Sequence, residues 1–342
     1  MSIRILAIPF LVMGIFLQFA LSGEMPPRER MRIGLSLPTL AEERWQRDLD
    51  NMVEQAKAMD IELIVQITMH DQYQQILNME QLITLGADVL IIAPHDSFGA
   101  GKAVEIAHDA GLKVISYDRL IFNADVDLFV SYDNDAVGRM QGEYLARKAP
   151  KGNYIILGGP VYDSNARFYR DGAMAVLQPL IDRGDITVLL DRNVDNWDTN
   201  ATKELVESVL AMSPRDVAAI LVPNDGMAAG AITALKQRGI EGVVVTGQDA
   251  DTNAVRRIVE GSQAMTVFKD IAKEVEAALE AAVLLSKGGD VTQLTRGRTV
   301  DNQGRDIPAV LLEPVLIQKA NLMQVLREAG HIEDSLQEET TR

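Results

Sequence analysis

The stretch SYDRLIFNADVDLFVSYDN, residues Ser116–Asn134, contains two apolar segments that each end in Ser-Tyr-Asp followed by a polar residue. Similar short apolar segments recur along the chain and predict strands, for example at residues 31–37, 87–94, 153–159 and 217–225. Between them lie stretches with an apolar residue every three or four positions, such as residues 45–59 and 202–212, which predict amphipathic helices. Strands that are apolar throughout and joined by helices form parallel sheets covered on both faces. The sequence therefore predicts an α/β fold with doubly wound parallel sheets.

The length and the composition limit the classes to which this protein can belong. At 342 residues the chain exceeds the size at which one core stays efficient, so two domains are expected. A hydrophobic content of 47% with 24% charged residues is typical of a globular protein. The net charge of −16 argues against nucleic-acid binding, which needs concentrated Lys and Arg. A DNA-binding repressor is excluded because no recognition helix precedes the first strand.

The N-terminal residues predict an export signal. Arg4 precedes an apolar run from Ile5 to Ala20, and the small-residue pattern Ala20-Leu21-Ser22 completes it. This pattern predicts a signal peptide over residues 1–23 and a periplasmic location. The alternative is a membrane anchor that is not cleaved, although the apolar run is shorter than the ~20 residues that a membrane span needs. With no Cys in the chain, neither a lipid nor a disulfide is expected, and the acidic residues 333–342 predict a solvated tail.

Polar residues follow the predicted strands repeatedly. They are Asp118-Arg119, Asp133-Asn134, Asp163 with Asn165, Asp195 with Trp197, Asn224-Asp225 and Gln248-Asp249. At any one position, Asp or Asn is explained more simply as the cap of the next helix. Because ligands of such folds bind beyond the carboxyl ends of the strands, the repetition predicts a binding site there.

No motif for catalysis or metal binding accompanies these residues. The chain lacks a glycine-rich phosphate loop, a Gly-x-Ser-x-Gly elbow and a His-Glu-x-x-His helix. Residues 249–260, DADTNAVRRIVE, space their acidic residues like a calcium loop. However, Ala254 stands where such a loop needs Gly, and residues 252–260 are expected to form a helix. We therefore expect a protein that is not an enzyme and that uses no cofactor and no metal.

The two tryptophans of the chain, Trp45 and Trp197, both stand among charged residues, in AEERWQRD and VDNWDTN. An indole can stack on the apolar face of a sugar ring while carboxylates, amides and guanidinium groups pair with its hydroxyls. Either tryptophan alone could be a packing residue. Together, one from each half of the chain, they predict a sugar ring held between the halves.

Several motifs in their order and spacing resemble one family. They are RIGLSL with ERW, VISYDR, VSYDN, GGPVYDSNAR, VDNW, PNDGMAAGAI, VTGQDAD and MTVFKDI. Over residues 31–332 the chain resembles the ribose/galactose group of periplasmic sugar-binding proteins of ABC importers, and within it the D-xylose-binding members.

The resemblance implies a periplasmic binding protein type I fold, in which two doubly wound lobes are joined by a three-segment hinge. The N-terminal lobe would comprise residues 30–132 and 269–300, and the C-terminal lobe residues 133–268 and 301–332. The chain would cross between lobes within Ser116–Asn134, near TVFKDI and near TVDNQGRDIPAV.

The resemblance also implies the roles of individual residues. Trp45 and Trp197 would enclose the sugar ring, and its oxygens would be bound by Arg44, Asp118, Arg119, Asp163, Asn165, Asn224, Asp249 and Lys269. Lys269 would lie at the hinge and couple binding to closure; the alternative for this residue is a solvated lysine at a helix start.

Three functions are compatible with these features. The first is a monomeric receptor that captures a monosaccharide, D-xylose above others, and delivers it to an inner-membrane ABC permease. The second is a module that presents the same sugar to a membrane sensor, and the third is an enzyme using Asp118 and Asp249. Residues 36–45, 68–75 and 91–99 depart from the usual family sequence, which leaves the choice among xylose, arabinose, ribose and glucose open.

Overall fold

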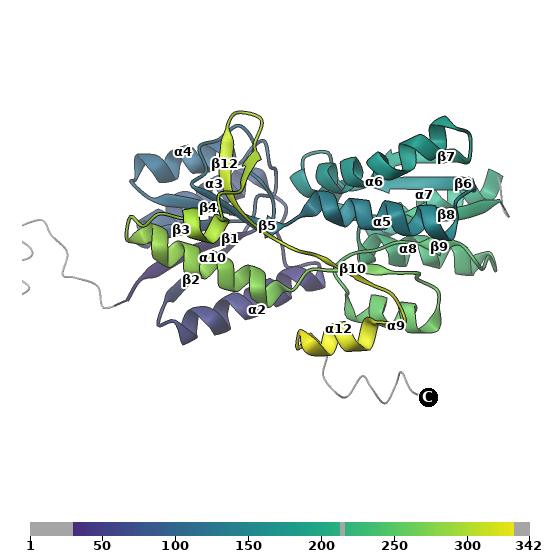
Figure 1. The fold of residues 1–342 in the computed structure, drawn as a ribbon. Helices are drawn as coiled ribbons and strands as arrows, with labels where there is room; N and C mark the ends of the chain where they lie inside the picture. The colour runs from purple at the N-terminus through teal and green to yellow at the C-terminus, as the bar shows by residue number, and fades with distance from the viewer. Residues whose placement is uncertain (1–29, 213–215, 332–342) are drawn as a thin grey trace, which may run out of the picture.

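The computed structural model describes residues 30–212 and 216–331, which form two lobes side by side (Figure 1). The predicted signal peptide, residues 1–23, and the predicted acidic tail, residues 333–342, lie outside the described residues. Within the described ranges, no helix is both long and apolar enough to cross a membrane.

The first lobe is built on a seven-stranded sheet with the order β11-β12-β5-β4-β3-β1-β2. All neighbours in it are parallel except β11 and β12, which are antiparallel. Its strands are β1 (Arg32–Leu37), β2 (Glu62–Ile67), β3 (Val89–Ile92), β4 (Lys113–Tyr117), β5 (Leu128–Tyr132), β11 (Thr299–Asp301) and β12 (Asp306–Leu312). Its helices are α2 (Glu43–Ala58), α3 (Gln72–Thr84), α4 (Gly101–Asp109), α10 (Ile271–Ser286) and α11 (Thr292–Thr295).

Successive side chains of the central strands enter two different cores. In β3, Val89 and Ile91 belong to the core that includes α2 and α10, whereas Leu90 and Ile92 belong to the core that includes α3 and α4. A strand that is apolar at every position must be covered on both faces, because its side chains alternate between them. The prediction of a doubly wound parallel sheet is confirmed in this lobe.

The second lobe repeats this plan on a four-stranded parallel sheet with the order β7-β6-β8-β9. Its strands are β6 (Gly152–Gly158), β7 (Ile186–Asn193), β8 (Val217–Leu221) and β9 (Val244–Val245). Its helices are α5 (Asn134–Lys148), α6 (Ser164–Asp182), α7 (Thr199–Met212), α8 (Asp225–Gln237) and α9 (Thr252–Glu260), with a short 3-10 turn, η1 (Asp195–Trp197). A two-stranded antiparallel sheet of β10 (Thr266–Phe268) and β13 (Val315–Ile317) packs with α12 (Leu322–Glu328) against α9.

Helices α5 and α6 pack unusually closely, at glycine residues. A Cβ atom on Gly138 of α5 would lie 1.9 Å from the carbonyl oxygen of Tyr169 in α6, and one on Gly172 of α6 would lie 2.0 Å from the carbonyl oxygen of Asp135. Only residues without a side chain allow this approach. The contact fixes the position of α6, from which Tyr169 reaches the site described below.

Three segments connect the lobes. The chain passes from β5 into α5 at Asp133, returns from β10 to α10 through Lys269 and Asp270, and leaves the first sheet again between β12 and β13. The type I fold with its three-segment hinge is thereby confirmed.

The expected position of the third segment was wrong. The C-terminal lobe was expected to resume at residue 301, but β11 and β12 both belong to the first sheet, where Ala309 of β12 pairs with Phe129 of β5. The polar residues 302–305 form the turn of a hairpin between β11 and β12 rather than a passage between lobes. The chain therefore stays with the first sheet until Leu312.

Candidate functional site

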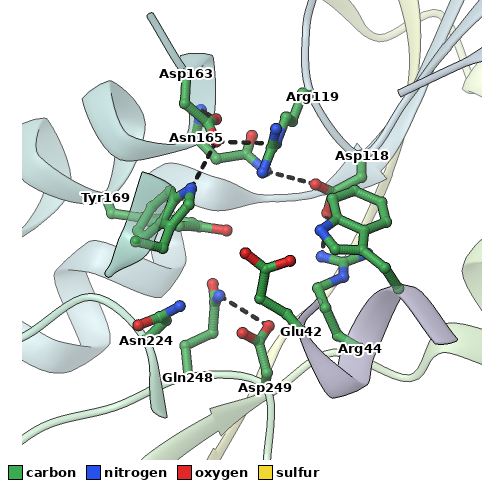
Figure 2. A pocket seen from close by; sticks show the side chains of 12 residues that line it. Glu42, Arg44, Asp118, Arg119, Asp163, Asn165, Tyr169, Asn224, Gln248 and Asp249 are labelled. Carbon is green, nitrogen blue, oxygen red and sulfur yellow. Dashed lines mark hydrogen bonds and ion pairs between the residues drawn. The ribbon is translucent and has the colours of Figure 1, made fainter. Parts of the chain in front are cut away.

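A pocket lies between the lobes, beyond the carboxyl ends of strands of both sheets (Figure 2). It contains about 360 Å³ that atoms do not fill. The first lobe lines it with Glu42, Arg44, Trp45, Asp118 and Arg119, and the second lobe with Asp163, Asn165, Tyr169, Trp197, Asn224, Gln248 and Asp249.

All but one of the residues predicted from the sequence line this pocket. The exception is Lys269, which is buried behind Asp118, where its Nζ donates to Asp118 Oδ1 at 3.0 Å and to the Tyr169 hydroxyl at 3.2 Å. With 3% of its surface exposed, Lys269 is not the solvated lysine of the alternative interpretation.

Two of the polar residues at strand ends both cap a helix and line the pocket. The side chain of Asp163 accepts from the backbone N–H of Asn165 at 2.9 Å, and that of Asn224 accepts from Met227 N–H at 2.9 Å. Both residues therefore cap a helix while lining the pocket. Asp133 also caps a helix, accepting from Ala136 N–H, but does not line the pocket.

Several lining residues adopt a backbone conformation that is rare for residues other than glycine. The φ angles are +58° at Asp118, +54° at Trp197 and +99° at Asp249. Such conformations cost roughly 1–3 kcal/mol each and persist only where the surroundings impose them. Their concentration around one pocket indicates that the loops are held in place for the side chains they present.

Asp118 is the centre of the buried charges. Its carboxylate accepts from Arg44 Nη1 at 2.6 Å, from Lys269 Nζ at 3.0 Å and from Asn165 Nδ2 at 2.9 Å. Burial alone would raise the pKa of this carboxyl, but the neighbouring Arg44, Lys269 and Arg119 outweigh it and hold the pKa below its usual value. Asp118 is therefore a carboxylate at neutral pH, and it accepts hydrogen bonds only.

A second acidic residue fixes the guanidinium of Arg44. Asp48, one turn further along α2, accepts from Arg44 Nε at 3.1 Å and Nη2 at 3.0 Å, and it also accepts from the Tyr117 hydroxyl. Held on both sides by Asp48 and Asp118, Arg44 presents its guanidinium in one orientation. A fork held in this way can pair with ligand oxygens without further loss of side-chain entropy.

The two tryptophans occupy different environments. Trp45 is 1% exposed and belongs to a core of the first lobe, while the guanidinium carbons of Arg44 and Arg119 lie 4.3 and 5.1 Å from its ring centre. Trp197 is half-buried, and its indole N–H donates to Asp163 Oδ2 at 3.1 Å. Of the charged sequence neighbours of Trp45, Arg44 packs over its ring, so a charged sequence context is compatible with a buried tryptophan.

Arg119 and Asp163 form a salt bridge across the lobes, with 2.9 Å between Arg119 Nε and Asp163 Oδ2. Burial raises the pKa of the Asp163 carboxyl above its usual value, although Arg119 opposes this effect. Arg119 also donates from Nη1 to the carbonyl of Pro94 at 3.1 Å.

The lobes also contact one another outside the pocket. On one side, Leu120 N–H donates to Ser164 Oγ at 2.7 Å and Ser97 N–H donates to the Tyr162 carbonyl at 2.9 Å. On the other, the carboxylate of Glu43 in α2 accepts from the hydroxyl of Thr252 at 2.7 Å, at the start of α9. With contacts on both sides of the pocket, the lobes are closed over it.

The stretch that resembled a calcium loop forms helix α9 over Thr252–Glu260, as expected. Among the described residues, no group of three or more His, Cys, Asp or Glu side chains is arranged to hold a metal ion.

Comparison with known protein families identifies the family of this chain. The model of a family described as "Periplasmic binding protein domain" matches residues 33–290. The chain belongs to this family. The resemblance predicted from the sequence motifs is thereby confirmed.

Similar proteins extend over nearly the whole of this periplasmic binding protein. It is 39% identical over 308 residues to the D-xylose-binding periplasmic protein of Haemophilus influenzae, covering 90% of this chain and 92% of the relative. It is 36% identical over 310 residues to the D-xylose-binding periplasmic protein of Escherichia coli, covering 90% and 93%. Among solved structures, a carbohydrate transporter solute-binding protein from Chloroflexus aurantiacus in complex with D-glucose superimposes with a TM-score of 0.84 at 32% identity, covering 90% and 98%.

Two residues that line the pocket of this binding protein were not singled out in the sequence: Glu42 and Tyr169. Gln248, which also lines it, was one of the polar residues at strand ends but was not among the ligand contacts that the resemblance implied. Tyr169 stands four residues after Asn165 on α6, and therefore on the same helix face. Glu42 follows no strand directly, and no sequence signal distinguished it from Glu43, which points to the other lobe's α9.

Proposed function

We propose that this protein captures a monosaccharide, D-xylose above others, between its closing lobes in the periplasm. It then delivers the sugar, as a monomer, to an inner-membrane ABC permease. The observation that carries this proposal is the pocket between the lobes, which combines an indole from each lobe with paired carboxylates, amides and guanidinium groups.

The chemistry of the lining suits a sugar. Trp45 and Trp197 offer flat apolar surfaces to the C–H faces of the ring. Asp118, Asp163 and Asp249 accept from hydroxyls, Arg44 and Arg119 donate to oxygen lone pairs, and Asn165 and Asn224 do both. Lys269 acts behind Asp118, at the second connection between the lobes, where it links the occupied pocket to the hinge.

The relatives support the choice of ligand and of partner. The two relatives above are D-xylose-binding proteins by name, and both are described as periplasmic. The Chloroflexus protein belongs to a carbohydrate transporter. A permease that recognises the closed form would bind the loaded protein in preference to the empty one.

A wider sugar range is the second candidate. The chain is 34% identical over 319 residues to a protein of Rhizobium radiobacter named as a multiple sugar-binding periplasmic receptor. That relative favours a protein that binds several monosaccharides and presents them to a sensor as well as to a transporter.

Catalysis is not part of the proposal. Despite burial, Arg44, Lys269 and Arg119 hold the pKa of Asp118 below its usual value, so its carboxylate is a poor general base opposite Asp249. Incubation with pentoses and oligosaccharides, followed by product analysis, would reveal an activity if one existed.

Tryptophan fluorescence tests the proposal directly, because both tryptophans of the chain line the pocket. Titration with D-xylose, arabinose, ribose, galactose and glucose is expected to give a saturable change in emission, at about micromolar concentration for xylose. Micromolar affinity corresponds to about 8 kcal/mol, which several charge-assisted hydrogen bonds can supply.

A Trp197→Phe variant leaves Trp45 as the single reporter and assigns the signal. If none of these sugars alters either the emission or the melting temperature, the protein is a binding protein for another class of ligand.

A further inference from the structure

Two oxygen atoms that line the pocket are buried without a hydrogen-bond partner. They are Oε2 of Glu42, from the first lobe, and Oε1 of Gln248, from the second. Figure 2 shows the carboxylate of Glu42 directed into the middle of the pocket, with Gln248 and Asp249 on the side opposite Asn165. An unsatisfied buried acceptor costs roughly 1–3 kcal/mol, so its retention in a pocket requires an explanation.

Gln248 is held so that its oxygen remains available. The side chain is 3% exposed, and its Nε2 donates to Asp249 Oδ1 at 2.9 Å. This hydrogen bond assigns the nitrogen to Asp249 and leaves Oε1 as an acceptor without a donor.

The carboxylate of Glu42 is likewise available as an acceptor. It stands at the N-cap of α2 in an extended conformation, yet its side chain makes no capping hydrogen bond. The next two residues are engaged elsewhere, Glu43 with Thr252 and Arg44 with Asp118. Within residues 30–212 and 216–331, no hydrogen bond or salt bridge engages the Glu42 carboxylate.

We propose that Glu42 and Gln248 form an acceptor pair that determines specificity by receiving hydrogen bonds from hydroxyl groups of the bound sugar. This inference rests on the proposed function and extends it to two residues to which the resemblance assigned no ligand contact. The pair selects monosaccharides with hydroxyl donors on the side of the ring that faces it, and it rejects analogues in which such a hydroxyl is replaced by hydrogen. Rejection is strong because the missing hydroxyl leaves one of the two acceptors buried and unpaired again.

The test is a series of calorimetric titrations of the wild-type protein and of the Glu42→Ala variant. The ligands are the best-binding monosaccharide and its monodeoxy analogues, each lacking one hydroxyl. Wild type is expected to bind at least one analogue about tenfold more weakly than the parent sugar, because the analogue loses a hydrogen bond to a charged acceptor. Glu42→Ala is expected to lose a similar factor for the parent sugar and to bind that same analogue no more weakly than the parent, within about twofold.

Two further variants make the result specific. Glu42→Gln keeps the shape and one acceptor oxygen, so it is expected to retain part of the discrimination even if the alanine variant folds poorly. Glu54→Gln removes a carboxylate from an exposed position of the same helix, and it is expected to match wild type with every ligand.

The outcomes separate this inference from the function on which it rests. If wild type binds no sugar, the proposed function fails and the acceptor pair falls with it. If wild type binds sugar but Glu42→Ala and Glu42→Gln bind the parent and every analogue as wild type does, the acceptor pair alone is overturned. The acceptor pair is also overturned if the effects of the substitution and of the missing hydroxyl simply add, so that Glu42→Ala still binds the same analogue tenfold more weakly than the parent sugar.

Discussion

At the scale of single residues, the buried carboxyl groups of the two lobes have different electrostatic surroundings. In the first lobe, Asp118 has Arg44 and Lys269 as partners. In the second lobe, Asp225 and Asp251 lie near each other and near Asp249. The pKa of Asp225 is raised to about 7 by burial and by Asp249. The second lobe therefore retains protons on carboxyl groups that would be ionised in water.

Asp251→Asn is expected to stabilise the protein at neutral and alkaline pH. Burial, together with the nearby carboxyls of Asp225, Asp249 and Glu43, raises the pKa of Asp251 to about 9. The folded state then holds a proton that the unfolded chain has released, so wild-type stability falls as the pH rises from about 4 to about 9. The variant lacks this dependence, and its advantage in melting temperature should grow across that interval.

The exposed Asp50→Asn on α2 is the control for removing a carboxyl, and its melting temperature should follow that of wild type. A constant difference between Asp251→Asn and wild type at all pH values would contradict the raised pKa.

Residue types at strand ends predicted most of the pocket, because topology alone brings the carboxyl ends of parallel strands together. The same reasoning could not find Glu42, which stands between a loop and a helix and is distinguished from Glu43 only by the direction of its side chain. The ligand contact of Lys269 was implied by the family resemblance and stays a prediction; in the structure Lys269 contacts Asp118 and does not line the pocket.

At the scale of elements, the pocket depends on how closely α5 and α6 pack. Gly138 allows α6 to approach until the carbonyl of Tyr169 occupies the space of a Cβ atom. Because the Tyr169 hydroxyl receives a hydrogen bond from Lys269, the position of α6 is transmitted to the buried charges around Asp118.

Gly138→Ala is expected to lower the free energy of unfolding and to weaken sugar binding. Overpacking costs typically about 1–3 kcal/mol, whereas the better helix propensity of alanine returns at most about 1 kcal/mol. Denaturant unfolding and calorimetric titration measure the two effects.

Gly226→Ala in α8 is the matched control. A Cβ atom there would meet its nearest neighbour at 3.6 Å, an ordinary contact, so this variant should be as stable as wild type or more stable. If Gly138→Ala behaved in the same way, the close approach of the two helices would not be important for stability.

Elements with a strong periodic pattern were predicted well, and their connections less well. The stretch around residues 299–310 was expected to cross between the lobes, and its strands were not predicted, because β12 pairs with β5 about 180 residues earlier in the chain. Strand pairing at that distance depends on tertiary packing, and local sequence carries little information about it.

At the scale of the whole molecule, contacts outside the pocket hold the lobes together. Glu43 accepts from the hydroxyl of Thr252 and from Arg47 Nη2 at 2.6 Å, while another nitrogen of Arg47 lies 2.6 Å from Nε2 of His331. His331 in turn lies 3.0 Å from the carbonyl of Ala250 through the same ring nitrogen. These side chains connect α2 of the first lobe to α9 and the C-terminal part of the second.

Glu43→Gln is expected to weaken sugar binding although Glu43 does not line the pocket. The substitution replaces the charged acceptor of the Thr252 hydroxyl, a contact made only when the lobes are closed, so the closed form becomes less favourable relative to the open form. Because only closed protein encloses the ligand, the apparent affinity should fall by the same factor as the closed population, about two- to tenfold. Calorimetry gives the affinity, and small-angle scattering with and without sugar gives the extent of closure.

Glu54→Gln on the same helix should leave both measurements unchanged. Equal affinity of Glu43→Gln and wild type would mean that the contact contributes nothing to closure.

The burial of Trp45 in a core of the first lobe restricts how this protein can diverge. A mutation that reshapes that wall of the pocket also disturbs the packing of α2 against its sheet, so it carries a penalty in folding before any new preference appears. Trp197 stands on a short turn and is half-buried, and changes there are tolerated more readily. Directed evolution toward a new ligand should therefore accumulate its first substitutions around Trp197 and leave Trp45 unchanged.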